Sequence, residues 1–189
     1  GSYNEGFHAP NLAQLFTGTL IRTVTGSTDT YRSAVTGLIT DGPSNRRSVA
    51  SGNRQLKPEV ASGKSAGIVI EVPGIKGLSF TVDYWEIAQK SLIISNGRDT
   101  SVDDARLRTY TQAQLAAGVP VSQIDVGYRL VPGDESGNYK GDPNTLRARV
   151  TPADQTLFAA ANGNLAASRQ LAPLGALIGG VVTFRNSTG

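Results

Sequence analysis

The chain has 189 residues, 22 glycines, no cysteine and a net charge of +3. The lack of cysteine excludes disulfides, thiolate metal sites and cysteine nucleophiles, and so small a charge gives no reason to expect nucleic acid as a partner. No run of about 18 apolar residues is present, which excludes a transmembrane helix. The 39 % hydrophobic residues and the abundant glycine favour a β-rich protein with long polar loops over a compact helical enzyme.

Positive charge is concentrated between residues 45 and 64. One acidic residue, Glu59, stands there against five basic residues: Arg46, Arg47, Arg54, Lys57 and Lys64. A solvated loop is the simpler interpretation of such a stretch. The functional alternative is a patch that meets an acidic ligand or the phosphates of lipopolysaccharide.

The clearest local signal is a β-hairpin from about residue 64 to residue 87. Both arms alternate with period two, and their apolar members are Ala66, Ile68, Ile70, Val72, Leu78, Phe80, Val82 and Tyr84. Residues 73–77 supply the turn. Each arm has about ten residues, the length that crosses a bilayer in a tilted barrel wall. The same alternation also fits a soluble sheet covered by a second layer.

Two helices and a further strand are expected after the hairpin. A helix start near Thr100 predicts a helix ending at Gly118, and Thr151-Pro152 predicts a second one ending near Gly163. Residues 131–144 between them are rich in turn formers and are expected to be irregular. The short apolar segment 174–184 is consistent with another strand.

No residue pattern indicates catalysis or a metal centre. His8 is the only histidine, so a histidine-based triad or metal site within one chain has no support. Asp103 and Asp104 are best explained as residues of a helix first turn, where carboxylates are favoured. A loop with oxygen ligands could suit calcium, but its spacing is not that of an EF-hand: Asp134, Glu135, Asn138, Asp142 and Asn144. We therefore expect no enzyme, no metal and no cofactor.

Two stretches resemble motifs of the TonB-dependent outer-membrane receptors. Gly6-Phe7-His8-Ala9-Pro10 is similar to the family's Gly-Phe-Arg-Ala-Pro, with His8 in place of the usual arginine. Residues 53–87 resemble the family's Asn-x-x-Leu-x-Pro-Glu followed by a descending strand, a short periplasmic turn and a rising strand. The two stretches occur in the family's order and at a matching distance.

The resemblance implies a mainly β fold: a segment of an antiparallel transmembrane β-barrel whose long extracellular loops hold short helices. Strands are expected at about 1–6, 64–73, 78–88 and 174–184, and outer loops at about 7–62 and 92–173. So few strands cannot close a barrel. The chain starts without methionine or a signal peptide and shows no plug domain, TonB box or terminal aromatic strand, so we expect an internal piece of a larger receptor.

The function implied by the resemblance is TonB-energised uptake of a scarce ligand, such as a siderophore or an oligosaccharide, at the cell outer membrane. The expected partners are outer-membrane lipid, lipopolysaccharide, the plug domain, TonB and the imported ligand. Ligand contacts are predicted at Arg46, Arg47, Arg54, Tyr110 and Tyr128, and lumen-facing positions at Ser65, Glu71, Ser79, Thr81 and Asp83. The alternative is a soluble secreted β-rich binding module, with carbohydrate as a candidate ligand.

Overall fold

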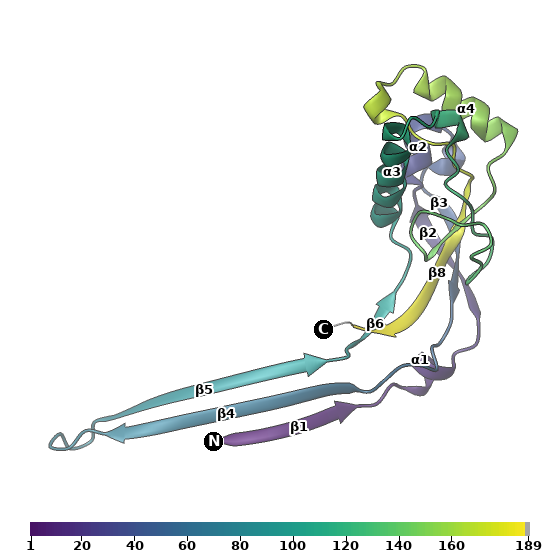
Figure 1. Cartoon of the computed structure of the whole chain (residues 1–189). Helices are drawn as coiled ribbons and strands as arrows, with labels where there is room; N and C mark the ends of the chain where they lie inside the picture. Colours follow the sequence, from purple (N-terminus) through teal and green to yellow (C-terminus); the bar gives the residue numbers. More distant parts are fainter. Residues whose placement is uncertain (188–189) are drawn as a thin grey trace. The chain divides into compact units, whose positions relative to one another are not determined.

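The structure is a computed structural model that describes residues 1–187 (Figure 1). It is mainly β, and neither of its two sheets closes on itself. The chain forms two compact units: a hairpin unit of residues 1–17, 52–95 and 184 onward, and a loop unit of residues 18–51 and 96–183. Within the described residues, no helix is both long and apolar enough to cross a membrane.

The hairpin unit is built on three antiparallel strands. They are β1 (Ser2–His8), β4 (Glu59–Glu71) and β5 (Ser79–Lys90), and β4 lies between the other two (Figure 1). The expected hairpin is therefore present, with arms of 13 and 12 residues. The turn closes with a 3.1 Å hydrogen bond from Val72 N to Leu78 O, and Gly74 and Gly77 supply its positive φ angles of 92° and 86°.

Strand register divides the hairpin into two faces. On one face Ile68 pairs with Val82 and Ile70 pairs with Phe80. These four side chains are 50–63 % exposed, because no second layer covers them in the described chain. The other face carries the five residues predicted to face a lumen: Ser65, Glu71, Ser79, Thr81 and Asp83. The predicted alternation thus corresponds to two physically distinct faces, one apolar and one largely polar.

Side-chain hydrogen bonds join the remaining segments of the hairpin unit. Helix α1 (Leu12–Phe16) begins with a capping box between Asn11 and Gln14. The strand expected at 174–184 is observed as β8 (Leu177–Asn186), and its last three residues belong to this unit. Asn186 accepts a 2.8 Å bond from Lys57 N and donates a 2.7 Å bond to Ser91 O.

The loop unit contains more regular structure than the predicted outer loops. The second sheet has the order β2 (Leu20–Ser27), β3 (Ser44–Ala50), β8, β6 (Ile93–Asn96), and β7 (Thr145–Arg147) also pairs with β8. Strand β3 runs parallel to β8, although their paired residues are more than 120 positions apart in the sequence. The sequence analysis assigned no strand to the ranges of β2, β3, β6 and β7.

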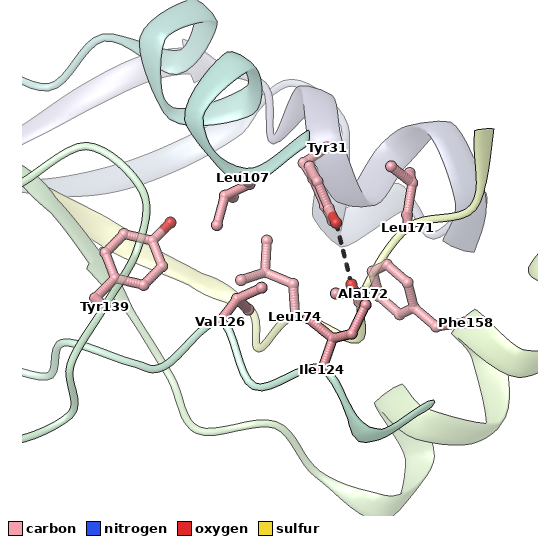
Figure 2. Close-up of a cluster of buried hydrophobic side chains, with 9 residues drawn as sticks. All are labelled: Tyr31, Leu107, Ile124, Val126, Tyr139, Phe158, Leu171, Ala172 and Leu174. Atoms are coloured by element: carbon pink, nitrogen blue, oxygen red, sulfur yellow. Dashed lines mark hydrogen bonds between the residues drawn. The ribbon is translucent and has the colours of Figure 1, made fainter. Parts of the chain in front are cut away.

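Helices cover the apolar centre of the loop unit. They are α2 (Thr30–Thr36), α3 (Thr100–Ala116) and α4 (Pro152–Asn162), with 3-10 turns at Ile39–Asp41, Val121–Gln123 and Ala167–Arg169. Both predicted helices are confirmed, and Thr151 forms the expected cap of α4. Figure 2 shows the buried cluster between them, made of Tyr31, Leu107, Ile124, Val126, Tyr139, Phe158, Leu171, Ala172 and Leu174.

Two buried arginines connect these helices to each other and to neighbouring segments. Arg147 in β7 bonds Asp103 at 2.7 Å, Tyr139 Oη at 3.1 Å and both carboxylate oxygens of Asp29. Burial alone would lower the pKa of Arg147, but these partners outweigh it and raise that pKa. Arg32 in α2 makes the second cluster by bonding Asp41 at 3.1 Å and Asp154 at 2.8 Å.

Asp103 stands in the first turn of α3, as expected. It is also buried, and it accepts bonds from Arg147, from Tyr139 Oη at 2.7 Å and from Asp142 N at 2.8 Å. The cap of α3 is Asp99, whose carboxylate accepts from Ser101 N and Val102 N. Asp103 therefore connects the first turn of α3 with β7 and with the loop before it.

Replacing Arg147 with methionine is expected to destabilise the loop unit by about 3–5 kcal/mol, because Asp29 and Asp103 would stay buried without a cation. Hydrogen exchange of the α3 amides in the intact receptor should accelerate a hundredfold or more. The matched control is Arg106→Met at an exposed position of the same helix, which should change little. Equal exchange in both variants would show that the cluster does not hold the unit together.

A second expected outcome concerns acid. Burial would raise the pKa of Asp154, but hydrogen bonds from Thr151 and the charge of Arg32 lower it overall. A carboxyl whose folded-state pKa is lowered stabilises the fold above its unfolded pKa of about 3.9, and that contribution is lost as pH falls below this value. Wild-type protection of α4, corrected for intrinsic exchange, should therefore decrease more between pH 6 and pH 3 than in Asp154→Asn. Identical decreases would contradict this linkage.

Candidate functional site

One face of the second sheet gathers arginine side chains within the loop unit. In the register of β2 and β3, Arg22 pairs with Ser48 and Val24 pairs with Arg46. Because side chains on one face recur every second residue, Arg22 and Arg46 lie on the same face. Gly180 of β8 pairs with Ser48 and continues this face. We call it the basic sheet face, and none of its residues on β2, β3 or β8 is acidic.

Arg98 lies over this face because Gly180 has no side chain. A Cβ built on Gly180 would come within 2.7 Å of the Cβ of Arg98. Arg98 stands two residues after the end of β6, so the strand brings it to this point. Beside it is a small cavity of about 130 Å³, lined by Val24, Arg46, Arg47, Ser48, Gly97, Arg98, Gly180 and Val182.

Arg46 and Arg98, two of the three arginines that line the cavity, each have a hydrogen-bond donor without an acceptor. Arg46 donates to Leu177 O at 3.1 Å and to Thr40 O, and Arg98 donates to Ser27 Oγ. Neither has a carboxylate within salt-bridge distance in residues 1–187. Each such buried donor left without a partner costs about 1–3 kcal/mol, and more when charged.

The unpartnered atoms are concentrated here. Within the described part of the chain, three buried side-chain N or O atoms lack a hydrogen-bond partner: Ser44 Oγ, Arg46 Nε and Arg98 Nη1. Ser44 stands two residues before Arg46, on the same face of β3, and it pairs with Ser27, the acceptor for Arg98. All three atoms thus belong to one region of the loop unit.

The electrostatic environment of Arg98 agrees with this geometry. Burial lowers the pKa of Arg98, and the positive charges of Arg147 and Arg46 lower it further, while Asp103 and Asp29 act in the opposite direction. Both of those carboxylates already bond Arg147. The side chain is therefore a partly desolvated cation without an ion-pair partner of its own.

The three arginines predicted to bind ligand do not share one surface. Arg46 lies on the basic sheet face, whereas Arg47, the next residue of β3, points its side chain to the opposite face and is exposed. Arg54 belongs to the hairpin unit, where its guanidinium carbon lies 5.3 Å from the ring centroid of Phe16. One predicted arginine, Arg46, thus remains in the candidate site with its side chain.

The two predicted tyrosines lie elsewhere in the loop unit. Tyr110 is half-buried against the apolar cluster, and Lys140 Nζ lies 5.6 Å from its ring centroid. Tyr128 is also half-buried, and the guanidinium of Arg149 stacks 3.8 Å from its ring centroid. Neither tyrosine lines the cavity beside Arg98.

The sequence analysis missed Arg22 and Arg98. A period-two pattern over residues 20–24 would have placed Leu20, Arg22 and Val24 on one face, but the range was taken as loop. No local signal points to Arg98, because its position depends on Gly180, which is 82 residues away in the chain.

The loop of residues 134–144, considered above as a calcium site, has acidic side chains that bond other protein groups. Asp134 accepts a 2.9 Å bond from Ser136 N, and Glu135 pairs with Arg129 at 2.7 Å. Asp142 accepts from Asp99 N at 3.0 Å and from Asn144 N at 3.2 Å. These bonds order the loop between Val126 and Arg147.

Comparison with known proteins places the chain in a family through a family model. No curated protein and no solved structure matches the chain. The family model described as "TonB dependent receptor-like, beta-barrel" matches residues 1–125, about two thirds of the sequence, and this range includes the hairpin, α3 and both Arg46 and Arg98. That family consists of outer-membrane receptors that act as transporters and not as enzymes. The chain belongs to the TonB-dependent receptor β-barrel family.

Proposed function

We propose that this chain forms part of the barrel wall and of the ligand-facing extracellular loops of a receptor in the cell outer membrane. The receptor takes up a scarce ligand, such as a siderophore or an oligosaccharide, with energy delivered through TonB. The plug domain, TonB, lipopolysaccharide and the imported ligand are its partners in this proposal.

The exposed apolar face of the hairpin is the observation that carries the proposal. Ile68, Ile70, Phe80 and Val82 leave a continuous apolar surface on paired strands. In water such a surface would need a covering layer. In a barrel wall it faces lipid, and the opposite face with Glu71 and Asp83 meets water in the lumen. The lengths of β4 and β5 suffice to cross the bilayer.

Tyrosines and charges lie toward the end of the apolar face that is distant from the turn. Tyr84 Oη donates a 3.0 Å bond to Glu86, and Tyr3 Oη donates a 2.5 Å bond to Glu5. Lys64 pairs with both Tyr3 and Glu86 in the strand register. Aromatic side chains with charged neighbours are typical of the membrane–water boundary. This supports a membrane–water boundary at that end of the strands. The proposed orientation, with the short turn in the periplasm and the long loops outside, follows from the short periplasmic turns and longer outer loops of such barrels.

The loop unit supports the second half of the proposal. It has its own buried apolar cluster and its own buried ion pairs, so it is a folded unit rather than a set of flexible loops. Binding residues on a rigid support lose less entropy when a ligand is captured. Arg46, Arg47, Tyr110 and Tyr128 in this unit, together with Arg54, are the proposed contact residues.

A soluble secreted binding module is the rival function. It would require the apolar face of the hairpin to be covered, and within residues 1–187 these side chains are exposed. The two functions differ in detergent dependence. A lipid-facing hairpin aggregates when detergent is removed, whereas a soluble module remains monomeric.

Membrane assembly tests the assignment of the two faces. Ile70→Asp should lower assembly of the full receptor, because a carboxylate on the lipid face beside Phe80 and Val82 is destabilising, although by less than the roughly 2–4 kcal/mol of a lysine or arginine at the bilayer midplane. The amount of heat-modifiable receptor in the outer-membrane fraction measures the effect.

Two controls use the opposite face of the same strand. Val69→Asp introduces the same charge beside Thr81, and Glu71→Ala removes a charge beside Ser79. Both should assemble at near wild-type levels. The proposal is wrong if Ile70→Asp and Val69→Asp assemble equally well.

A further inference from the structure

The basic sheet face of the loop unit has a combination of features that packing does not explain. Two guanidinium groups and a serine hydroxyl keep buried polar atoms without partners, at Ser44, Arg46 and Arg98. A small cavity adjoins both arginines, and neither has an ion pair in the described chain. Elsewhere in this unit the buried arginines, Arg32, Arg129 and Arg147, are paired with carboxylates.

We propose that Arg46 and Arg98 form a binding site for an oxyanion, a carboxylate or phosphate group of the receptor's ligand, with Arg22 at its rim. Guanidinium N–H groups bind oxyanions through short charge-assisted hydrogen bonds. The orphaned Nε of Arg46 and Nη1 of Arg98 supply such donors. Arg22 adds a third positive charge on the same face and is exposed.

The cavity limits what the site takes. Its volume of about 130 Å³ is well below that of a pocket enclosing a drug-sized molecule. It suits one oxyanion with a few attached atoms while the rest of the ligand lies outside. The lining offers cationic and hydroxyl donors and no acidic side chain, which selects against cations and favours an anionic group.

Gly180 gives the site a geometric requirement. Any side chain at this position meets Arg98 at its Cβ, Cδ and Nε atoms. The backbone there does not have a positive φ, so the glycine is needed for the space above it rather than for its conformation. The missing side chain of Gly180 therefore leaves the space in which Arg98 lies against the sheet, with its guanidinium beside the cavity.

The inference rests on the proposed receptor function for its natural ligand, but its chemistry is measured independently with inorganic phosphate. The intact receptor in detergent is titrated by calorimetry as wild type, Arg98→Gln and Arg46→Gln. Loss of a charge-assisted donor should weaken phosphate binding about tenfold or more in each variant. Arg106→Gln, which removes an exposed arginine from α3, should bind like wild type.

A charge-conserving variant separates geometry from net charge. Gly180→Ala keeps every arginine but displaces Arg98, so phosphate binding should weaken without any change of charge. Arg98→Lys keeps the charge without the planar donor set and should recover part of the affinity. Unchanged circular dichroism and melting temperature show that the variants are folded.

The outcomes separate the two claims. If Arg98→Gln and Arg106→Gln bind phosphate equally well, or if wild type binds none, the oxyanion site is wrong even when the receptor assembles in the outer membrane. If phosphate binding depends on Arg98 but the protein does not assemble there, the site stands and the receptor function fails.

The source of the oxyanion is decided by a second measurement. Lipopolysaccharide that copurifies with wild type and with Arg98→Gln is quantified from its phosphate content. Equal amounts identify the group as part of a free ligand. A parallel loss of lipopolysaccharide and of inorganic phosphate binding identifies it as a lipid headgroup.

Discussion

The loop unit depends on the buried charge of Arg147. This one guanidinium joins the cap of α2 at Asp29, the first turn of α3 at Asp103 and the loop at Tyr139. Those segments come from distant parts of the sequence, so the arginine helps to determine how α2, α3 and the loop before β7 pack together. Removing two carboxylates and a guanidinium from water is costly, and the cost is offset only while all partners are present. The cluster therefore contributes specificity as much as stability.

The two units differ in where their apolar side chains lie, exposed in the hairpin unit and buried in the loop unit. In the hairpin unit, large apolar side chains such as Ile70 and Phe80 point outward from a sheet without a covering layer. In the loop unit, Leu107 and Phe158 are fully buried, and Arg32 and Arg147 are paired with aspartates inside. A membrane wall and a water-exposed platform require these two arrangements, because lipid solvates apolar side chains and water does not. The solvation of the two units thus supports the proposed membrane wall and outer loops.

Structures formed by residues close together in the sequence could be predicted, whereas contacts between residues far apart in the sequence could not. The hairpin and the caps at Thr151 and Gly163 are local, so alternation and start signals were enough to find them. The strands β2 and β3 were missed because their pattern is short and charged. The first-turn position of Asp103 was predicted, but its pairing with Arg147, 44 residues away, was not, because no local pattern encodes such a pairing. Long-range pairing also determines which arginine reaches the cavity.

The arginines illustrate the difference between charge count and charge placement. The sequence gives five basic residues between 45 and 64, yet β-strand alternation separates Arg46 from Arg47, and Arg54 stacks on Phe16. Arg98 comes from outside that stretch and reaches Arg46 because Gly180 leaves room for it. A buried cation is stable when a carboxylate of the fold pairs with it or when a ligand does. Arg147 has such carboxylates in Asp29 and Asp103. Arg98 has none within the described residues, and the proposed oxyanion would take that place.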